Sequence, residues 1–562
     1  MIYLKKRCTN SLTANKKSFL FIVFISLIFI TPQLITCNMV IGSDAIFHFN
    51  RFYDTSEQIR NGNFEYFISL YGFQQSGRIV NAFYGPFVAY LHGLLVLFSK
   101  NWFVYQVLSN LILFIISGCS MYTFLRAGHF TYRKSRIGAV LYMCTFSILY
   151  WATRQGFSSW GSALMPLCLT VIFYVFEERR VPRFKLGFFT AFLFQTHILS
   201  ALILVLIYTP IFLYAFIKNT NKLDFVVAIL KEILLFIMLT LNIWSTYFII
   251  TRENRLVAPF INHTMSSNTI NQNSYYWLLN PMSLILMLLI ILGIFFSKWK
   301  THSTDLKMLF IIMLSFLLLS TSLIPWNYFI EKNVSIVELI QFPFRFFVPV
   351  TILLIYLFLQ ITDFEKLNNY FVVLGILQVV ILMFATLNSW NNDENYILSG
   401  PNTIIENNDV DSVKKSFFLK DKSESLKIVE KTTPDYLPIY DNTDLNKYKL
   451  YEEKIIYKNE IFEKSVNNSK LIIYMDQSDD KYTELPVIIY TDTILSTNGI
   501  EIAKRDYKLS EIGTPIIPNG LIENNQVEIA FDHQLSDFFI VITVILWIVV
   551  GLVYLYRARI KI

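Results

Sequence analysis

The sequence predicts an all-α polytopic membrane protein with about 12 transmembrane helices, the last of which follows a β-rich extracytoplasmic domain. Hydrophobic residues make up 54% of the 562 residues, charged residues only 16%, and the mean hydropathy is +0.47. This composition excludes a soluble protein with a few buried helices. Apolar runs with polar boundaries predict spans at 18-37, 102-125, 137-152, 161-176, 187-198, 199-217, 225-250, 278-297, 308-324, 345-361, 370-387 and 538-556.

The basic connections between these runs predict the orientation of the chain. They are Arg126 to Arg136, Arg179 to Lys185, Lys218 to Lys222, Lys298 to Lys307, and the tail Arg557 to Lys561. The positive-inside rule places them in the cytoplasm, together with both termini, and their charge points to lipid and not to nucleic acid. If 83-98 also crossed, the basic stretch 126-136 would lie outside, so 83-98 is predicted to be re-entrant or interfacial. The run 187-217 is too long for one span and should break near His197.

Three regions follow from this threading. They are a multi-spanning membrane domain at 1-387 with an outer loop at 38-101, an extracytoplasmic domain at 388-536, and a last span with a basic cytoplasmic tail at 537-562. The middle region is rich in Asn, Asp and Lys. Its runs 470-475 and 485-490 have the composition of β-strands.

Three ionisable residues stand together just after the first predicted span. Asp44, His48 and Arg51 lie at positions i, i+4 and i+7, so a helix would place them on one face. Such a face could bind a phosphate through Arg51 and take a proton through Asp44 or His48. The alternative is a juxtamembrane segment in which the aspartate caps a helix and the arginine meets lipid headgroups.

Four later polar residues lie at predicted span ends on the same outer side: Arg154, His197, Gln341 and Arg345. Arginine suits the binding of phosphate oxygens, and histidine and glutamine can assist by hydrogen bonding. Each also has a structural alternative. The arginines could reach only to headgroups, and His197 could satisfy a broken helical backbone.

Several of these motifs, in this order, resemble one bacterial family. The stretches are Asp44-Ala-Ile-Phe-His-Phe-Asn-Arg51, Ile59-Arg-Asn-Gly62, Phe83-Tyr-Gly-Pro86, Gln195-Thr-His197 and Gln341-Phe-Pro-Phe-Arg345. Together they resemble the YfhO-like membrane proteins and their relatives labelled "6-pyruvoyl-tetrahydropterin synthase-related". The likeness covers roughly residues 18 to 390. The label does not imply pterin chemistry, since no histidine-zinc ligand set is visible.

The resemblance implies a GT-C-like membrane core that uses a polyprenyl-phosphate sugar donor. Asp44 then takes the place of the acidic residue in the first outer loop. Metal-dependent members often have a second acidic residue; Asp54 and Glu57 are candidates by proximity alone. Whether the protein uses a divalent metal therefore stays open; Asp44 and Asp54 are the residues that would hold one. No other cofactor is implied.

The resulting hypothesis is a plasma-membrane glycosyltransferase acting at the outer surface. Asp44, with His48, would serve as base or position the acceptor, and Arg51, Arg154, His197, Gln341 and Arg345 would bind substrate. Its partners would be a lipid-linked sugar donor, a cell-envelope glycan or glycolipid acceptor, and the bilayer. Two alternatives remain: a transporter or flippase of a lipid-linked anion, and a non-catalytic scaffold for envelope assembly.

Overall fold

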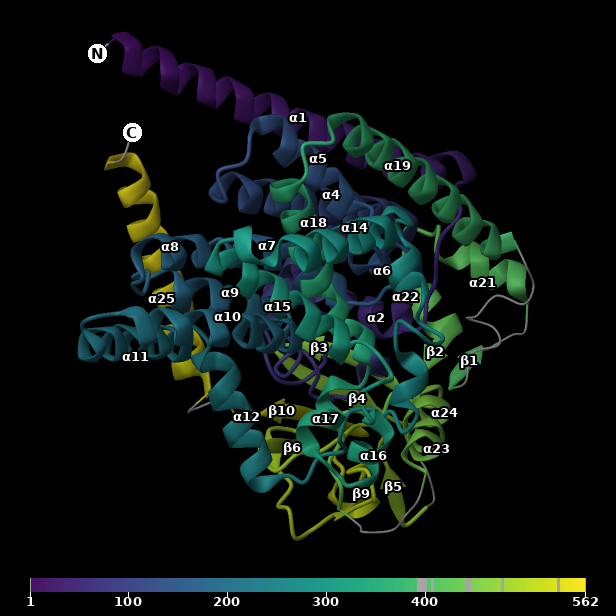
Figure 1. Ribbon diagram of the computed structural model, residues 1–562. Helices are drawn as coiled ribbons and strands as arrows, with labels where there is room; N and C mark the ends of the chain where they lie inside the picture. Colours follow the sequence, from purple (N-terminus) through teal and green to yellow (C-terminus); the bar gives the residue numbers. More distant parts are fainter. Residues whose placement is uncertain are drawn as a thin grey trace. The chain divides into compact units, whose positions relative to one another are not determined.

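The computed structural model describes residues 2–391, 402–405, 409–440, 446–476, 480–532 and 536–560 (Figure 1). Within these residues seven helical segments are long and apolar enough to cross a membrane. They are Thr13–Thr36, Trp102–Ala127, Ser158–Glu178, Ile198–Lys218, Ser283–Thr301, Pro343–Ile361 and Glu365–Asn391. The number becomes eight if α11 (Lys222–Leu239) and α12 (Leu241–Glu253) form one interrupted span. The chain is a helical membrane protein with a β-containing C-terminal region, but twelve spans are not confirmed.

Several predicted spans are shorter or broken in the structure because hydropathy does not register where a helix stops. The run 137-152 is divided between α5 (Tyr132–Met143) and α6 (Phe146–Arg154). The Phe146 N–H at the start of α6 donates to the Asn280 carbonyl at 3.1 Å, in place of a carbonyl four residues earlier. The short apolar helices include α3 (Pro86–Phe98), the segment predicted to be re-entrant or interfacial, and Asp537–Val553 in the predicted last span.

The predicted break near His197 is confirmed. Helix α9 (Leu186–Thr196) ends there and α10 (Ile198–Lys218) begins. His197 has the extended backbone angles φ −157° and ψ 108°, so the chain leaves the helical conformation at this one residue.

The chain folds into two compact units, of which the first comprises Met1–Gly42, Gln106–Leu235 and Ile261–Asn392. Its remaining helices are α1 (Ile2–Thr36), α4 (Trp102–Ala127), α7 (Ser158–Leu169), α8 (Val171–Glu178), α13 (Tyr276–Leu279), α14 (Ser283–Lys298), α15 (Thr304–Leu319), α16 (Trp326–Glu331), α17 (Ser335–Ile340), α18 (Phe347–Ile361) and α19 (Glu365–Asn388). Short turns of 3-10 helix are η2 (Met265–Asn268), η3 (Trp299–Thr301), η4 (Pro343–Phe346) and η5 (Ser389–Asn391). Helix α18 is buried from Phe347 to Leu359 and packs on α5, α14 and α15.

Ion pairs join the basic connections of this first unit to acidic residues elsewhere in it. Arg179 pairs with Asp305 at 2.9 Å, and Lys134 pairs with Asp363 at 2.8 Å. These contacts join the connection 179-185 to 298-307, and the connection 126-136 to the residues that follow α18.

The second unit comprises Ser43–Tyr105, Phe236–Phe260 and Asp393–Ile562. Its further helices are α2 (Ala45–Asn61), η1 (Phe73–Gln75), α21 (Val410–Ser416), α22 (Ser423–Ile428), α23 (Lys447–Tyr451), the π-helix η6 (Glu452–Ile456), α24 (Tyr457–Asn459), η7 (Asn519–Leu521) and α25 (Ser536–Ile560). Its strands are β1 (Thr403–Ile405), β2 (Val429–Lys431), β3 (Glu463–Asn467), β4 (Lys470–Tyr474), β5 (Tyr482–Glu484), β6 (Thr493–Thr497), β7 (Ile500–Glu501), β8 (Lys508–Leu509), β9 (Pro515–Pro518) and β10 (Gln526–Phe531).

Antiparallel pairing organises these strands into three sheets, in the orders β3-β4-β10-β6-β7, β5-β9-β8 and β1-β2. Strand β10 lies at the centre of the largest sheet. Its buried residues Val527, Ile529 and Phe531 alternate with more exposed ones, as expected for a strand with one face on a core. The predicted strand at 470-475 is confirmed as β4, paired with β10 and β3.

The run 485-490, by contrast, is not a regular strand. Pro486 lacks an N–H, and the neighbouring N–H groups reach different partners: Leu485 donates to Pro515 and Ile488 donates to Ser76. The apolar residues of this run are nevertheless buried. The composition therefore predicted burial correctly and regular pairing incorrectly.

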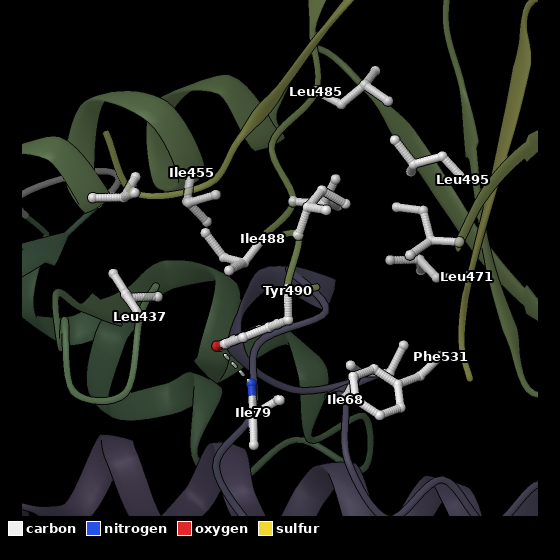
Figure 2. Packing of buried hydrophobic residues seen from close by; sticks show 14 of the residues in the cluster. Ile68, Ile79, Leu437, Ile455, Leu471, Leu485, Ile488, Tyr490, Leu495 and Phe531 are labelled. Atoms are coloured by element: carbon white, nitrogen blue, oxygen red, sulfur yellow. Dashed lines mark hydrogen bonds between the residues drawn. The ribbon is translucent and has the colours of Figure 1, made fainter. Parts of the chain in front are cut away.

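The predicted outer loop forms the core of the second unit together with the polar C-terminal region. In Figure 2, Ile68 of this loop lies beside Phe531 and Ile79 lies beside Tyr490, within a cluster that also contains Leu471 and Leu485. At full burial, side chains of this size contribute about 1.5 to 3 kcal/mol each. The loop 38-101 thus joins residues 393–562 in one unit from residue 43 onward, which differs from its predicted grouping with the membrane domain.

Candidate functional site

Helix α2 carries the first group of candidate residues, so the helical conformation that would place them on one face is present. It begins after Asp44 and ends at Gly62, whose positive φ of 69° is the left-handed conformation that commonly closes a helix. Asp44 occupies the cap position but makes no side-chain cap hydrogen bond there. The side chain of Asp44 is partly exposed. Its carboxylate therefore does not act as the helix cap that the alternative interpretation required.

His48 and Arg51 lie on the same face of α2 and are both buried. An Arg51 nitrogen lies 3.4 Å from Nδ1 of His48, and other guanidinium nitrogens donate to Asn81 Oδ1 at 3.0 Å and to the Tyr84 carbonyl at 3.1 Å. The guanidinium also lies over the Tyr84 ring, 4.5 Å from its centroid. Burial lowers the pKa of Arg51 to about 10. Arg51 thus ties α2 to residues 81–84 from within the packed interior.

Asp54, a candidate for a metal site, has another task in the structure. Its Oδ1 accepts the backbone N–H groups of Leu70, Tyr71 and Gly72 at 2.9, 2.7 and 3.1 Å, and its Oδ2 accepts the amide of Gln58 at 2.8 Å. Burial raises the pKa of Asp54 to about 6, although the three N–H groups oppose this shift. The carboxylate therefore fixes the turn at 70–72. Among the described residues no group of three or more His, Cys, Asp or Glu side chains is placed to hold a metal ion.

Residues 431–435, which sequence reasoning did not connect with Asp44, lie beside it in the second unit. The ammonium of Lys431, at the end of β2, donates a hydrogen bond to the carbonyl of Ser43, next to Asp44. Asp44 also interacts electrostatically with Lys431 and with Asp435. Burial lowers the pKa of Lys431 and raises that of Asp435, and the charge of Asp44 opposes the first shift and adds to the second.

Arg78 holds this segment in place and is itself fully buried. One guanidinium nitrogen donates to the carbonyl and hydroxyl of Thr433 at 2.5 and 3.0 Å, and another donates to the Asp435 carbonyl at 2.7 Å. The guanidinium also lies over the rings of Phe73 and Tyr451, at 4.9 and 5.3 Å. The dipeptide Pro434-Asp435 marks a turn in sequence, but no spacing rule connects a turn in this region to Asp44.

The candidates Arg154 and Arg345 lie in the first unit, at the two ends of one series of aromatic contacts. The exposed Arg154 donates to the Tyr276 hydroxyl at 3.1 Å and lies over its ring at 4.5 Å. Arg345 donates to the Ile340 carbonyl and to Gln341 Oε1 at 2.9 and 3.0 Å. It lies over Phe342 at 5.0 Å. The rings that join the two arginines are Tyr276, Phe146, Trp277, Phe344 and Phe342.

Gln341 and His197 serve local backbone roles in the same unit. Gln341 follows α17 with a φ of 58°, and its carbonyl accepts the Asn262 amide at 2.8 Å. His197 Nδ1 accepts the Ser200 N–H at 3.2 Å and lies 2.8 Å from the Ser200 hydroxyl. The imidazole therefore caps α10, which is the structural alternative proposed for it.

The structure thus divides the predicted site residues between two units. Asp44, His48 and Arg51 belong to the second unit, whereas Arg154, His197, Gln341 and Arg345 belong to the first. A cavity of about 470 Å³ lies in the first unit and is lined by residues of α1 and α4, among them Phe19 and Arg126; none of the candidate residues lines it. The charged groups around Asp44 therefore define the candidate site better than the shape of a cavity does.

Fold and site define a helical integral membrane protein that presents a mixed-charge cluster around Asp44. Comparison with protein-family models, with curated proteins and with solved structures finds no match.

Proposed function

We propose that this protein is a membrane glycosyltransferase that moves a sugar from a polyprenyl-phosphate donor to a cell-envelope acceptor at the outer surface of the plasma membrane. The observation that carries the proposal is the position of Asp44. Its partly exposed carboxylate stands at the start of α2, beside Lys431 and Asp435. A base and a cation side by side are what transfer from a phosphate to a hydroxyl requires.

In this reaction the acceptor hydroxyl oxygen forms a bond to the anomeric carbon of the sugar. The bond from that carbon to the phosphate oxygen breaks, and its electron pair leaves with the phosphate. Asp44 accepts the proton of the acceptor hydroxyl, or positions that hydroxyl for attack. Positively charged side chains stabilise the phosphate as it leaves.

Two other candidates take a supporting role in this proposal. The enclosed pair His48 and Arg51 holds α2 against residues 81–84 and so positions Asp44. A base and an electrostatic contribution of this kind are typically worth about 10² to 10⁴-fold in rate.

The experiment compares envelope glycans by mass spectrometry in four strains: wild type, a deletion, Asp44→Asn and Glu57→Gln. The Glu57 variant is a matched control, because it removes one carboxylate from α2 that pairs with Arg60 at 3.0 Å and lies thirteen residues from Asp44. We expect one sugar modification to be lost in the deletion and in Asp44→Asn, and to be kept in Glu57→Gln. Protein amount and unfolding midpoint are measured for each variant.

A strain with Asp44→Asn whose glycans match wild type, beside a deletion that is altered, would contradict the proposal. The carboxylate would then be dispensable, and a transporter of a lipid-linked anion or an assembly scaffold would fit the deletion better.

A further inference from the structure

The ammonium of Lys431 has hydrogen-bonding capacity that the protein does not use. A lysine ammonium has three N–H donors, and the Ser43 carbonyl takes one of them. In the part of the chain that the structure describes, this ammonium makes no second hydrogen bond and no ion pair within 4 Å. Lys431 is partly exposed, and two of its donors remain for a ligand.

The segment that carries Asp435 is held in a strained and tightly anchored conformation. Tyr436 has a φ of 65°, a left-handed backbone conformation that bulky residues rarely adopt. The Tyr490 hydroxyl donates to the Tyr436 carbonyl at 3.1 Å, and the Tyr436 N–H donates to the Val257 carbonyl at 3.1 Å. Arg78 secures the carbonyl of Asp435 itself. Strain of this kind persists where surrounding contacts fix a functional geometry.

The charges around this point select the chemistry of the ligand. The ammonium can bind an anion, whereas the carboxylates of Asp44 and Asp435 repel an anion and accept hydrogen bonds from hydroxyl groups. A ligand that satisfies all three groups carries an anionic phosphate beside several hydroxyls. A sugar linked to a phosphate has this combination.

We propose that Lys431 and Asp435 complete the Asp44 site, with Lys431 binding the phosphate of the lipid-linked sugar donor and Asp435 accepting hydrogen bonds from hydroxyls of its sugar. This inference rests on the proposed function, which it deepens. In this site the positive charge of Lys431 neutralises the phosphate, a role that a divalent cation fills in metal-dependent sites. The site therefore needs no added metal to bind the phosphate.

The first test measures binding of farnesyl phosphate, a short prenyl phosphate without a sugar, to the full chain in detergent by intrinsic tryptophan fluorescence. We expect saturable binding that EDTA does not change and that farnesol does not reproduce. Lys431→Met weakens it about tenfold or more, because charge-assisted hydrogen bonds are lost, and Lys431→Arg retains most of it. Lys454→Met is the matched control, since Lys454 in the same unit is paired with Glu484.

The second test separates the roles of the two residues and the source of the phosphate. Asp435→Asn should not weaken farnesyl phosphate binding, because it removes a charge that repels the anion, and it should lower the envelope sugar modification. An excess of phosphatidylglycerol should not displace farnesyl phosphate. Displacement would assign the ammonium to bilayer headgroups and overturn the proposal of a donor site.

The outcomes distinguish this inference from the proposed function. If Lys431→Met binds farnesyl phosphate as wild type does while Asp44→Asn abolishes the sugar modification, the role of Lys431 is refuted and the transferase stands. If binding depends on Lys431 but Asp44→Asn leaves the glycans unchanged, the transferase fails and a phosphate site remains. EDTA-sensitive binding would refute the role of Lys431 as the neutralising charge.

Discussion

Replacing Arg78 by lysine tests whether the guanidinium fork, and not charge alone, anchors the segment that carries Asp435. The arginine makes three hydrogen bonds from two nitrogens, to Thr433 and Asp435, with no exposed surface. Lysine keeps the buried charge but has a single nitrogen, so it cannot reach both carbonyls in the same geometry. The cost of burying the charge is therefore similar in the two proteins. The difference in their free energies of unfolding measures what the two-nitrogen geometry of the guanidinium contributes.

The magnitude follows from the number of bonds lost. A hydrogen bond to a charged group contributes about 1.5 to 3 kcal/mol, and at least one of the three is lost in Arg78→Lys. We expect the free energy of unfolding of the second unit to fall by about 2 to 3 kcal/mol. That loss is large beside the total stability of about 5 to 15 kcal/mol that domains usually have.

The assay is denaturant unfolding of the full chain in detergent, with the same measurement on Arg505→Lys. Arg505 is a suitable control because it is 89% exposed and its contact to Asp506 is long, at 3.8 Å. The control should change stability by less than about 0.5 kcal/mol. An Arg78→Lys protein as stable as wild type would refute the argument that the fork anchors residues 433–435.

Two further predictions concern pH and the break between α9 and α10. Burial raises the pKa of Asp54 to about 6 in the folded protein, against 3.8 as the ordinary value. The folded state therefore binds more protons than the unfolded state between these pH values. The free energy of unfolding falls as pH rises through this window. From pH 7.5 to pH 5, the free energy of unfolding of wild type should rise by about 1.4 kcal/mol relative to that of Asp54→Ala. Denaturant titrations of both proteins at both pH values check this. A relative loss of stability at pH 5 would show that the three N–H groups outweigh burial in setting the pKa. His197→Ala should cost about 1 kcal/mol by removing the cap on Ser200, whereas His197→Asn should keep it, as unfolding midpoints would show. A His197→Asn protein of wild-type stability that has lost the sugar modification would instead give the imidazole a catalytic role.

Local signals in the sequence predicted the features that depend on neighbouring residues. The break at His197 and the strand at 470-475 follow from span length and from β-branched composition over a few residues. The same signals could not register the interruption at Cys144 and Thr145, after which the Phe146 N–H donates to the distant Asn280 carbonyl and not to a carbonyl of the preceding turn. The sequence therefore contains more apolar runs than the described residues contain regular spans.

The sequence by itself determined that this is a helical membrane protein, because hydropathy is a property of short segments. Only the tertiary structure decided that the outer loop shares a core with the polar C-terminal region, and that Lys431 and Asp435 stand beside Asp44. Contacts between residues so far apart in the chain depend on packing and on buried hydrogen bonds such as those of Arg78, and no local pattern encodes them.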